Sequence, residues 1–397
     1  MTQQTAPAAQ VAKPNGTSSS SGRRRRLGGV GAFAEDHRST AILLGMVVIV
    51  LMLPVIASIP PFSFFQGLDV WLSGFSNAGV FVLLALGLNI VVGLAGLLDL
   101  GYAAFFAIGA YAYAYGASPY SGNHFPFILM IVVGAVVAAT FGVLLGAPTL
   151  RLRGDYLAIV TLGFGEIVPI VFLNAEQFTE GTNGIGGIFK PDIPFVEFTL
   201  LNPWPFYILM GVIVSITILL IYRLQDSRIG RAWMAIREDE LAAAASGLNT
   251  VTTKLLAFAL GASTAGLAGV FNASKLTLVS PDQFLSTVSF SILTMIVLGG
   301  MGNIWGVALG AFVIYTIQVV FLKQLNAFFQ ALDVPILRDV NFIQYQFLLF
   351  GIALVLMMLF RPEGLFPSRR RKRELHAAED LGEENASIAG SLGEAPQ

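Results

Sequence analysis

The side chains that could do chemistry are concentrated in one polar stretch, residues 223–254 (the 223–254 loop), which lies between two apolar runs. Its charged residues are Arg223, Arg228, Arg231, Arg237, Lys254, Asp226, Glu238, Asp239 and Glu240. Charged side chains are excluded from the core of a bilayer. We therefore expect this loop to lie in the cytosol and to contact a partner there.

Other reactive residue types are sparse. The chain has no Cys, which excludes thiol catalysis, disulfides and zinc–thiolate sites. Its three His residues, His37, His124 and His376, are too scattered to suggest a metal site. No GxxxxGK[ST] run is present to hold ATP phosphates. We expect no metal, no cofactor, no nucleic acid partner and no catalysis in this chain.

Acids in the apolar runs are the next candidates. Residues 155–174 contain Thr161, Gly163, Gly165, Glu166 and Pro169, which predict a thinly packed helix with one buried acid and a break. Loosened backbone can bind a zwitterion, with N–H groups for the carboxylate and carbonyls for the ammonium. If the chain carries a solute across a membrane, we expect Thr161, Gly163, Gly165 and Glu166 to line its pathway. Alternatively, Glu166 pairs with a basic group of a partner or stays protonated in a structural role.

The composition of the chain indicates which structural elements hold these residues in place. Hydrophobic residues make up 55% of the chain and charged residues 12%, about half of the ~25% found in soluble domains. The 42 glycines suit helices that pack closely in lipid. A bilayer core needs about 20 apolar residues per helix. The sequence predicts an all-α polytopic membrane protein with about ten spans, near 39–59, 71–93, 100–117, 127–148, 155–174, 204–222, 255–273, 286–302, 304–322 and 343–360. Whether 286–322 forms two spans or one broken span stays open.

The basic residues predict the orientation. With ten spans and both termini in the cytosol, 19 of the 23 Lys and Arg residues lie on the cytosolic side, as the positive-inside rule requires. We expect residues 1–38 to form a disordered cytosolic tail and residues 367–397 to form a polar cytosolic tail. Residues 39–366 are expected to form a transmembrane domain in the plasma or inner membrane. The run Arg23–Arg26 either signals topology or binds anionic membrane lipid.

The 223–254 loop itself predicts two short helices. Asp226 or Ser227 can cap a helix that runs to about Arg237, and Asp239 can cap a second one. Gly247 suits the left-handed position at the end of the second helix. Two amphipathic helices form a knob that fits a groove on a partner, or alternatively lie on the membrane surface.

These helices carry a family resemblance. The runs GRAWMAIREDELAAAASGLN (230–249) and KLLAFALGASTAGLAG (254–269) resemble the coupling loop of ATP-binding-cassette importer permeases of the branched-chain amino acid family, M-type subunit. The family signature Glu-Ala-Ala with a later Gly is partly kept, because Leu241 stands where Glu is expected. The resemblance implies contact with an ATPase by Gly230, Arg231, Arg237, Glu238, Asp239, Glu240, Ala242, Ala243 and Gly247.

Further segments resemble the same family in the expected order. They are 86–114, 154–174, 180–188, 295–314 and 360–366. Two of them share the pattern IVxGxxG, IVVGLAG (90–96) and IVLGGMG (296–302), which suggests an internal repeat.

The resemblance implies a function. We expect a pore-forming permease subunit that pairs with a second homologous permease, two cytosolic ATPase subunits and an external substrate-binding protein. Its expected cargo is branched-chain amino acids. The alternatives are an importer of urea or short amides and a stand-alone secondary transporter, although a carrier would not need the 223–254 loop.

Overall fold

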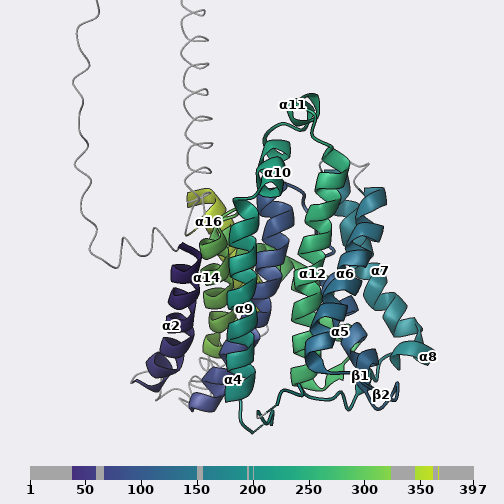
Figure 1. Ribbon diagram of the computed structural model, residues 1–397, viewed down its shortest axis with the longest axis vertical. Helices are drawn as coiled ribbons and strands as arrows, with labels where there is room; N and C mark the ends of the chain where they lie inside the picture. Colours follow the sequence, from purple (N-terminus) through teal and green to yellow (C-terminus); the bar gives the residue numbers. More distant parts are fainter. Residues whose placement is uncertain are drawn as a thin grey trace, which may run out of the picture. The chain divides into compact units, whose positions relative to one another are not determined.

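The computed structural model describes residues 38–59, 67–149, 155–194, 196–199, 201–322, 345–360 and 365. Most of both predicted tails therefore lies outside the described residues. From Leu43 onward the described residues form one unit. Its long helices run roughly side by side (Figure 1).

Helices account for most of the described chain. They are α2 (Arg38–Ser58), α4 (Leu68–Leu88), α5 (Ala103–Gly116), α6 (Phe127–Thr149), α7 (Asp155–Asn174), α8 (Glu176–Thr179), α9 (Trp204–Gln225), α10 (Arg228–Glu238), α11 (Glu240–Ala245), α12 (Thr250–Leu276), α13 (Ser286–Gly299), α14 (Ile304–Tyr315) and α16 (Gln346–Phe360). Two π-helical turns, η1 (Asn89–Leu94) and η3 (Thr316–Phe321), continue α4 and α14, and η2 (Pro281–Phe284) is a 3₁₀ turn.

Six helices within the described ranges are long and apolar enough to cross a membrane, so the chain is a mostly helical, multi-pass membrane protein. They are Leu68–Leu94, Phe127–Thr149, Tyr156–Asn174, Trp204–Gln225, Thr250–Leu276 and Pro281–Gly299. Helix is also present in the other four predicted ranges, but there it is shorter or less fully described. α5, for example, has only 14 residues. The count of ten spans stays a prediction.

Helix α12 is the centre of the packing and stands between α9 and α6 in Figure 1. Its most extensive contacts are with α6, α5 and α4. Small residues make these contacts close: a Cβ added at Gly109 of α5 would lie 2.5 Å from the Cα of Gly266 of α12. Ala107 and Ala110 of α5, on either side of Gly109, are fully buried. Close backbone approach of this kind stabilises helices in lipid, where no hydrophobic driving force acts between them.

The segment 286–322 forms two helices rather than one broken helix. α13 ends at Gly299, and the chain reverses through Gly300 and Gly302, whose φ angles are +108° and +81°. A Cβ added at Gly310 of α14 would lie 2.5 Å from the Cα of Gly299, so the two helices pack as a hairpin.

Short elements connect the helices at the end opposite α10 and α11 (Figure 1). Strand β1 (Ala117–Ser118) pairs with β2 (Asn123–His124), and β3 (Ile185–Gly186) pairs with β4 (Leu278–Val279), both antiparallel. The second pair ties the segment after α7 to the end of α12.

Candidate functional site

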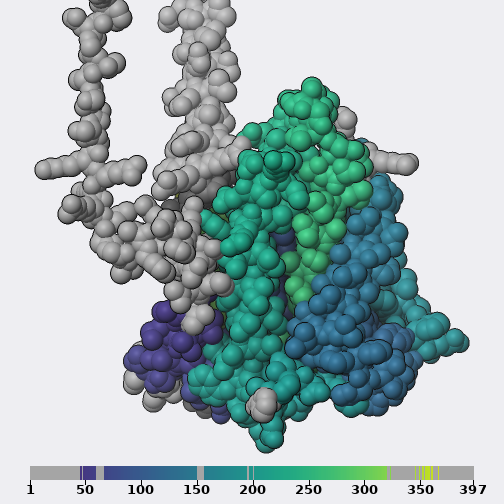
Figure 2. All heavy atoms as spheres, viewed as in Figure 1, coloured from purple at the N-terminus to yellow at the C-terminus, as the bar shows by residue number. Residues whose placement is uncertain are grey.

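The 223–254 loop folds into α10 and α11, and α11 lies farther out than the neighbouring ends of α9 and α12 (Figure 1), where it forms the tip seen in Figure 2. Ser227 caps α10, its Oγ accepting from the N–H of Gly230 at 3.3 Å. Trp233 is fully buried, and its Nε1 donates to the carbonyl of Thr253 at 2.7 Å. Buried Trp rings with a bonded N–H give well-defined packing. The middle of α10 is thereby fixed to the first turn of α12.

Helix α11 is the exposed tip. Asp239 caps it, with Oδ1 accepting from the N–H groups of Leu241 and Ala242 at 2.8 and 3.0 Å. Gly247 has φ +87°, and the N–H of Leu248 then donates to the carbonyl of Ala243 at 3.1 Å. The predicted cap and the predicted left-handed glycine are both confirmed.

The faces of α11 differ in exposure. Ala243 is buried against the protein, whereas Ala242 and Ala244 are exposed, and Leu241 is 71% exposed. Leu241, Ala242 and Ala244 therefore form the exposed apolar part of α11. Lys254 Nζ lies 2.5 Å from Glu240 Oε1, so an ion pair ties α11 to α12.

Arg237 extends from α10 into the helical bundle. Its Nη1 donates to the carbonyl of Gly93 in η1. Gly96 and Gly302, the last glycines of the two IVxGxxG copies, flank the same side chain, with φ +72° and +81°. A Cβ at Gly96 would lie 2.7 Å from Arg237 Cγ, and one at Gly302 would lie 3.5 Å from Nη1.

Asn89 joins the two repeat copies beside Arg237. Its Oδ1 accepts from the N–H of Gly302 at 2.9 Å, so η1 and the α13–α14 turn are bonded to each other. The sequence alone did not indicate that the two copies meet at Arg237. The shared glycine spacing was the signal that could have indicated it. Arg237 of the 223–254 loop therefore contacts both IVxGxxG segments, which are also bonded to each other.

Helix α7 differs from its prediction in two respects. It is continuous through Pro169, so the predicted break is wrong. Glu166 is exposed rather than buried, and it accepts a hydrogen bond from Ser286 Oγ at the start of α13. A proline in a membrane helix can be accommodated by neighbouring groups without interrupting the helix.

The other predicted pathway residues of α7 have unlike surroundings. Thr161 is buried and its Oγ1 accepts from the N–H of Leu100 at 3.0 Å. Gly165 packs on Gly101, whose Cα would be 2.9 Å from an added Cβ, while Gly163 faces open space. Thr161 and Gly165 therefore hold α7 against the segment before α5, and only Gly163 and Glu166 are accessible.

Comparison with known proteins identifies the family. Residues 70–359 match the family model described as the permease component of the branched-chain amino acid transport system. The chain belongs to this permease family. No solved structure matches it.

Several curated relatives are similar to this permease. It is 39% identical over 329 residues to the high-affinity branched-chain amino acid transport system permease protein LivM of Salmonella typhimurium, covering 77% of this chain and 72% of that protein. LivM of Escherichia coli strain K12 gives the same identity and coverage. LivH of Escherichia coli strain K12 is 24% identical over 266 residues, covering 63% of this chain and 84% of that protein. Because these relatives are transport permeases, the prediction of a transport subunit rather than an enzyme is confirmed.

Proposed function

We propose that this permease is a pore-forming subunit of an ATP-driven importer of branched-chain amino acids. The observation that carries this proposal is the 39% identity to LivM over most of the chain, which includes the 223–254 loop. The relatives do not favour an importer of urea or short amides or a stand-alone carrier.

The family and the two differently shaped ends of the helical bundle suggest which partners the permease has. The weaker similarity to LivH supports a second homologous permease that completes the pore. Two cytosolic ATPase subunits dock on this loop and on its counterpart in the partner permease. Among the residues expected to make this contact, those that are exposed and can touch an ATPase are Arg231, Glu238, Asp239, Ala242 and Gly247. Gly230 and Ala243 are buried and Arg237 points into the bundle, so these three support the loop from inside. Exposed Leu241 and the alanines beside it supply the apolar part of that contact. An external substrate-binding protein delivers cargo at the opposite end.

The topology that suits these partners has ten spans in the inner or plasma membrane, with both termini in the cytosol. It puts α11 on the ATPase side and the β1–β2 turn on the binding-protein side. Cysteines introduced singly into this Cys-free chain test it. An impermeant thiol reagent should label residue 123 from outside and residue 240 only after permeabilisation, and the reverse pattern would refute the orientation.

The pathway includes the accessible side of α7. Glu166 and Gly163 face the path, while Thr161 and Gly165 keep this helix in position against the chain before α5. Ser286, at the start of α13, donates a hydrogen bond to the carboxylate of Glu166 and holds it in place. The negative charge of Glu166 attracts the ammonium group of a zwitterion to this point.

Competition for uptake tests the proposed cargo. Proteoliposomes contain the chain, its partner permease and the ATPases, with ATP inside and the binding protein outside. Leucine uptake should be displaced by isoleucine and valine and unaffected by urea. Uptake of urea in preference to leucine would overturn the assignment of cargo while leaving the importer mechanism intact.

A further inference from the structure

A row of hydroxyl side chains follows one face of α13. Thr287, Ser291 and Thr294 recur at spacings of four and three residues, so they share a helical face. Ser291 Oγ donates to the carbonyl of Thr287, and Thr294 Oγ1 donates to that of Phe290, both at 2.9 Å. Because the protons are used within the helix, the oxygen lone pairs remain able to accept hydrogen bonds from a ligand.

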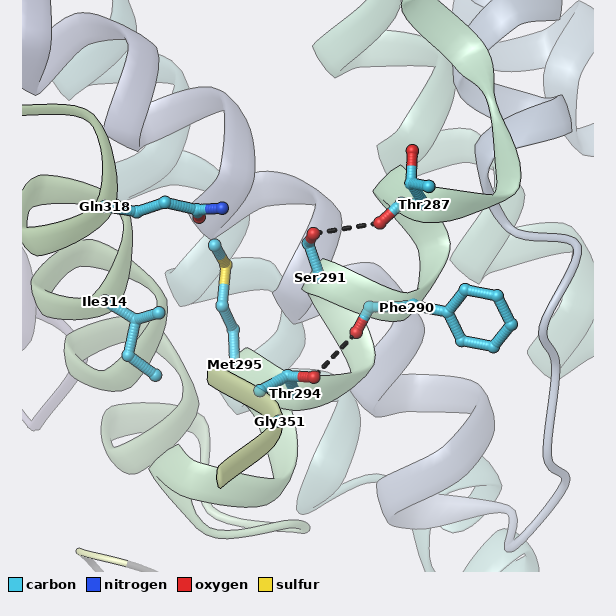
Figure 3. Close-up of a pocket in the computed structure, with 8 residues that line it drawn as sticks. All are labelled: Thr287, Phe290, Ser291, Thr294, Met295, Ile314, Gln318 and Gly351. Atoms are coloured by element: carbon cyan, nitrogen blue, oxygen red, sulfur yellow. Dashed lines mark hydrogen bonds between the residues drawn. The ribbon is translucent and has the colours of Figure 1, made fainter. Parts of the chain in front are cut away.

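The row borders a hollow of about 340 Å³ between α13, the α14–η3 helix and α16 (Figure 3). Gln318, in the π-helical turn η3, points across the hollow toward α13 (Figure 3). Met295 and Ile314 supply an apolar wall. Single π-helical turns are rare and occur frequently at functional sites.

The lining suits one class of ligand. Hydroxyl oxygens can accept from an ammonium group, and the amide of Gln318 can donate to a carboxylate. Met295 and Ile314 can contact an aliphatic side chain. The volume is at the lower end of the ~300–1000 Å³ typical of small-molecule sites, which fits one amino acid. A lipid tail would leave the two hydroxyls bonded to their own helix, but it would leave the amide of Gln318 without a partner, so lipid is a poor occupant.

The hydroxyl row begins one residue after the contact of α13 with α7, on a neighbouring face of the helix. Ser286, which bonds to Glu166, directly precedes Thr287. α13 begins at the end of the bundle opposite α11, because α12 starts beside α11 and runs 27 residues to the other end. The hydroxyl row therefore starts near the α7 contact and runs along α13 away from the proposed binding-protein side.

We propose that Thr287, Ser291, Thr294 and Gln318 form a substrate site of the permease, which takes one zwitterionic amino acid with an aliphatic side chain. The site rests on the proposed function and deepens it by naming the residues that contact the cargo within the membrane. The second permease closes the open side of the hollow.

Transport by matched variants tests the site. Thr294→Val keeps side-chain shape and removes the hydroxyl. Thr140→Val is the control, since Thr140 is an exposed hydroxyl on α6 that bonds to its own helix in the same way, at 2.8 Å to the carbonyl of Val136. In proteoliposomes with saturating loaded binding protein, Thr294→Val should lower the leucine uptake rate by about five- to tenfold, the effect of one lost hydrogen bond. Equal rates for the two variants would overturn the proposal.

Accessibility gives a second readout. A methanethiosulfonate reagent should modify Ser291→Cys in the complete complex, and leucine with binding protein and ATP should slow the reaction, whereas Thr140→Cys should stay unmodified in lipid. A Ser291→Cys that is shielded in the assembled complex with or without leucine would make this face a subunit interface and overturn the site. Absence of leucine uptake by the unaltered complex would instead refute the proposed function.

Discussion

Arg237 links the 223–254 loop to the helices in the membrane. Its guanidinium bonds to Gly93 of η1, and its stem covers Gly96. A charged hydrogen bond of this kind contributes about 1.5–3 kcal/mol. We infer that, if an ATPase docks on α11 as proposed, this contact transmits a movement of α10 to η1 and, through Asn89, to the α13–α14 turn.

Replacing Arg237 should uncouple the complex without dissociating it. In Arg237→Gln, leucine transported per ATP hydrolysed should fall about tenfold, since about 1.4 kcal/mol corresponds to one decade. Arg228→Gln, an exposed arginine in the first turn of the same helix, is the matched control and should behave as wild type. Reconstituted uptake and ATPase rates give the ratio, and an unchanged ratio in Arg237→Gln would contradict this role.

Gly247 determines how α11 ends. Its φ of +87° is unfavourable for a β-branched residue, by roughly 1–2 kcal/mol, while nothing lies within 4 Å to clash. Gly247→Val should therefore distort the tip alone, reducing ATPase co-purification and uptake severalfold. Gly122→Val is the control, because Gly122 has φ +69°, is equally open and lies in the β1–β2 turn. Full ATPase association in Gly247→Val would refute docking at this tip.

Local rules explain which residue roles could be predicted from the sequence. The caps at Ser227 and Asp239 and the left-handed Gly247 depend only on neighbouring residues, so the sequence was sufficient. The exposure of Glu166 depends on which helix packs against each side of α7, and sequence spacing does not encode that. Its bond to Ser286 joins residues 120 positions apart, which no local pattern indicates.

At the scale of elements, glycine contacts between α5, α6 and α12 decide the packing. A Cβ at Gly266 would lie 2.5 Å from the carbonyl oxygen of Gly134 and 2.7 Å from Ala138 Cβ. Gly266→Ala should therefore lower the melting temperature of the purified permease, since overpacking costs about 1–3 kcal/mol. Gly45→Ala, at an exposed helical glycine with nothing within 4 Å, should leave it unchanged. If Gly266→Ala melted at the same temperature as Gly45→Ala, the close contact between α6 and α12 would not contribute to stability.

Long apolar elements were predictable because the bilayer imposes their length. The predicted span 155–174 coincides with α7, and 127–148 differs from α6 by one residue at its end. The predicted span 100–117 was too long at both ends, because α5 begins only at Ala103, after a non-helical segment held by Thr161. This shortening depends on a contact with α7, which the spacing of residues within 100–117 does not encode.

At the scale of the whole molecule, the proposed function gives the chain a pore wall and a docking tip, and the sequence has no GxxxxGK[ST] run for ATP. Its acidic groups do not form a relay through the membrane: among the described residues, Glu166 is exposed at the α7–α13 contact and Asp99 is buried beside Gly101. This arrangement supports the proposal that the energy for accumulation comes from the partner ATPases.

The most direct measurement is the energy source of leucine uptake. Proteoliposomes contain the permease, its partner permease and the ATPases, with loaded binding protein outside and ion gradients collapsed. We predict accumulation that requires internal ATP and that persists, at a lower rate, in Glu166→Gln. Accumulation driven by a proton or sodium gradient without ATP, and abolished in Glu166→Gln, would contradict the account.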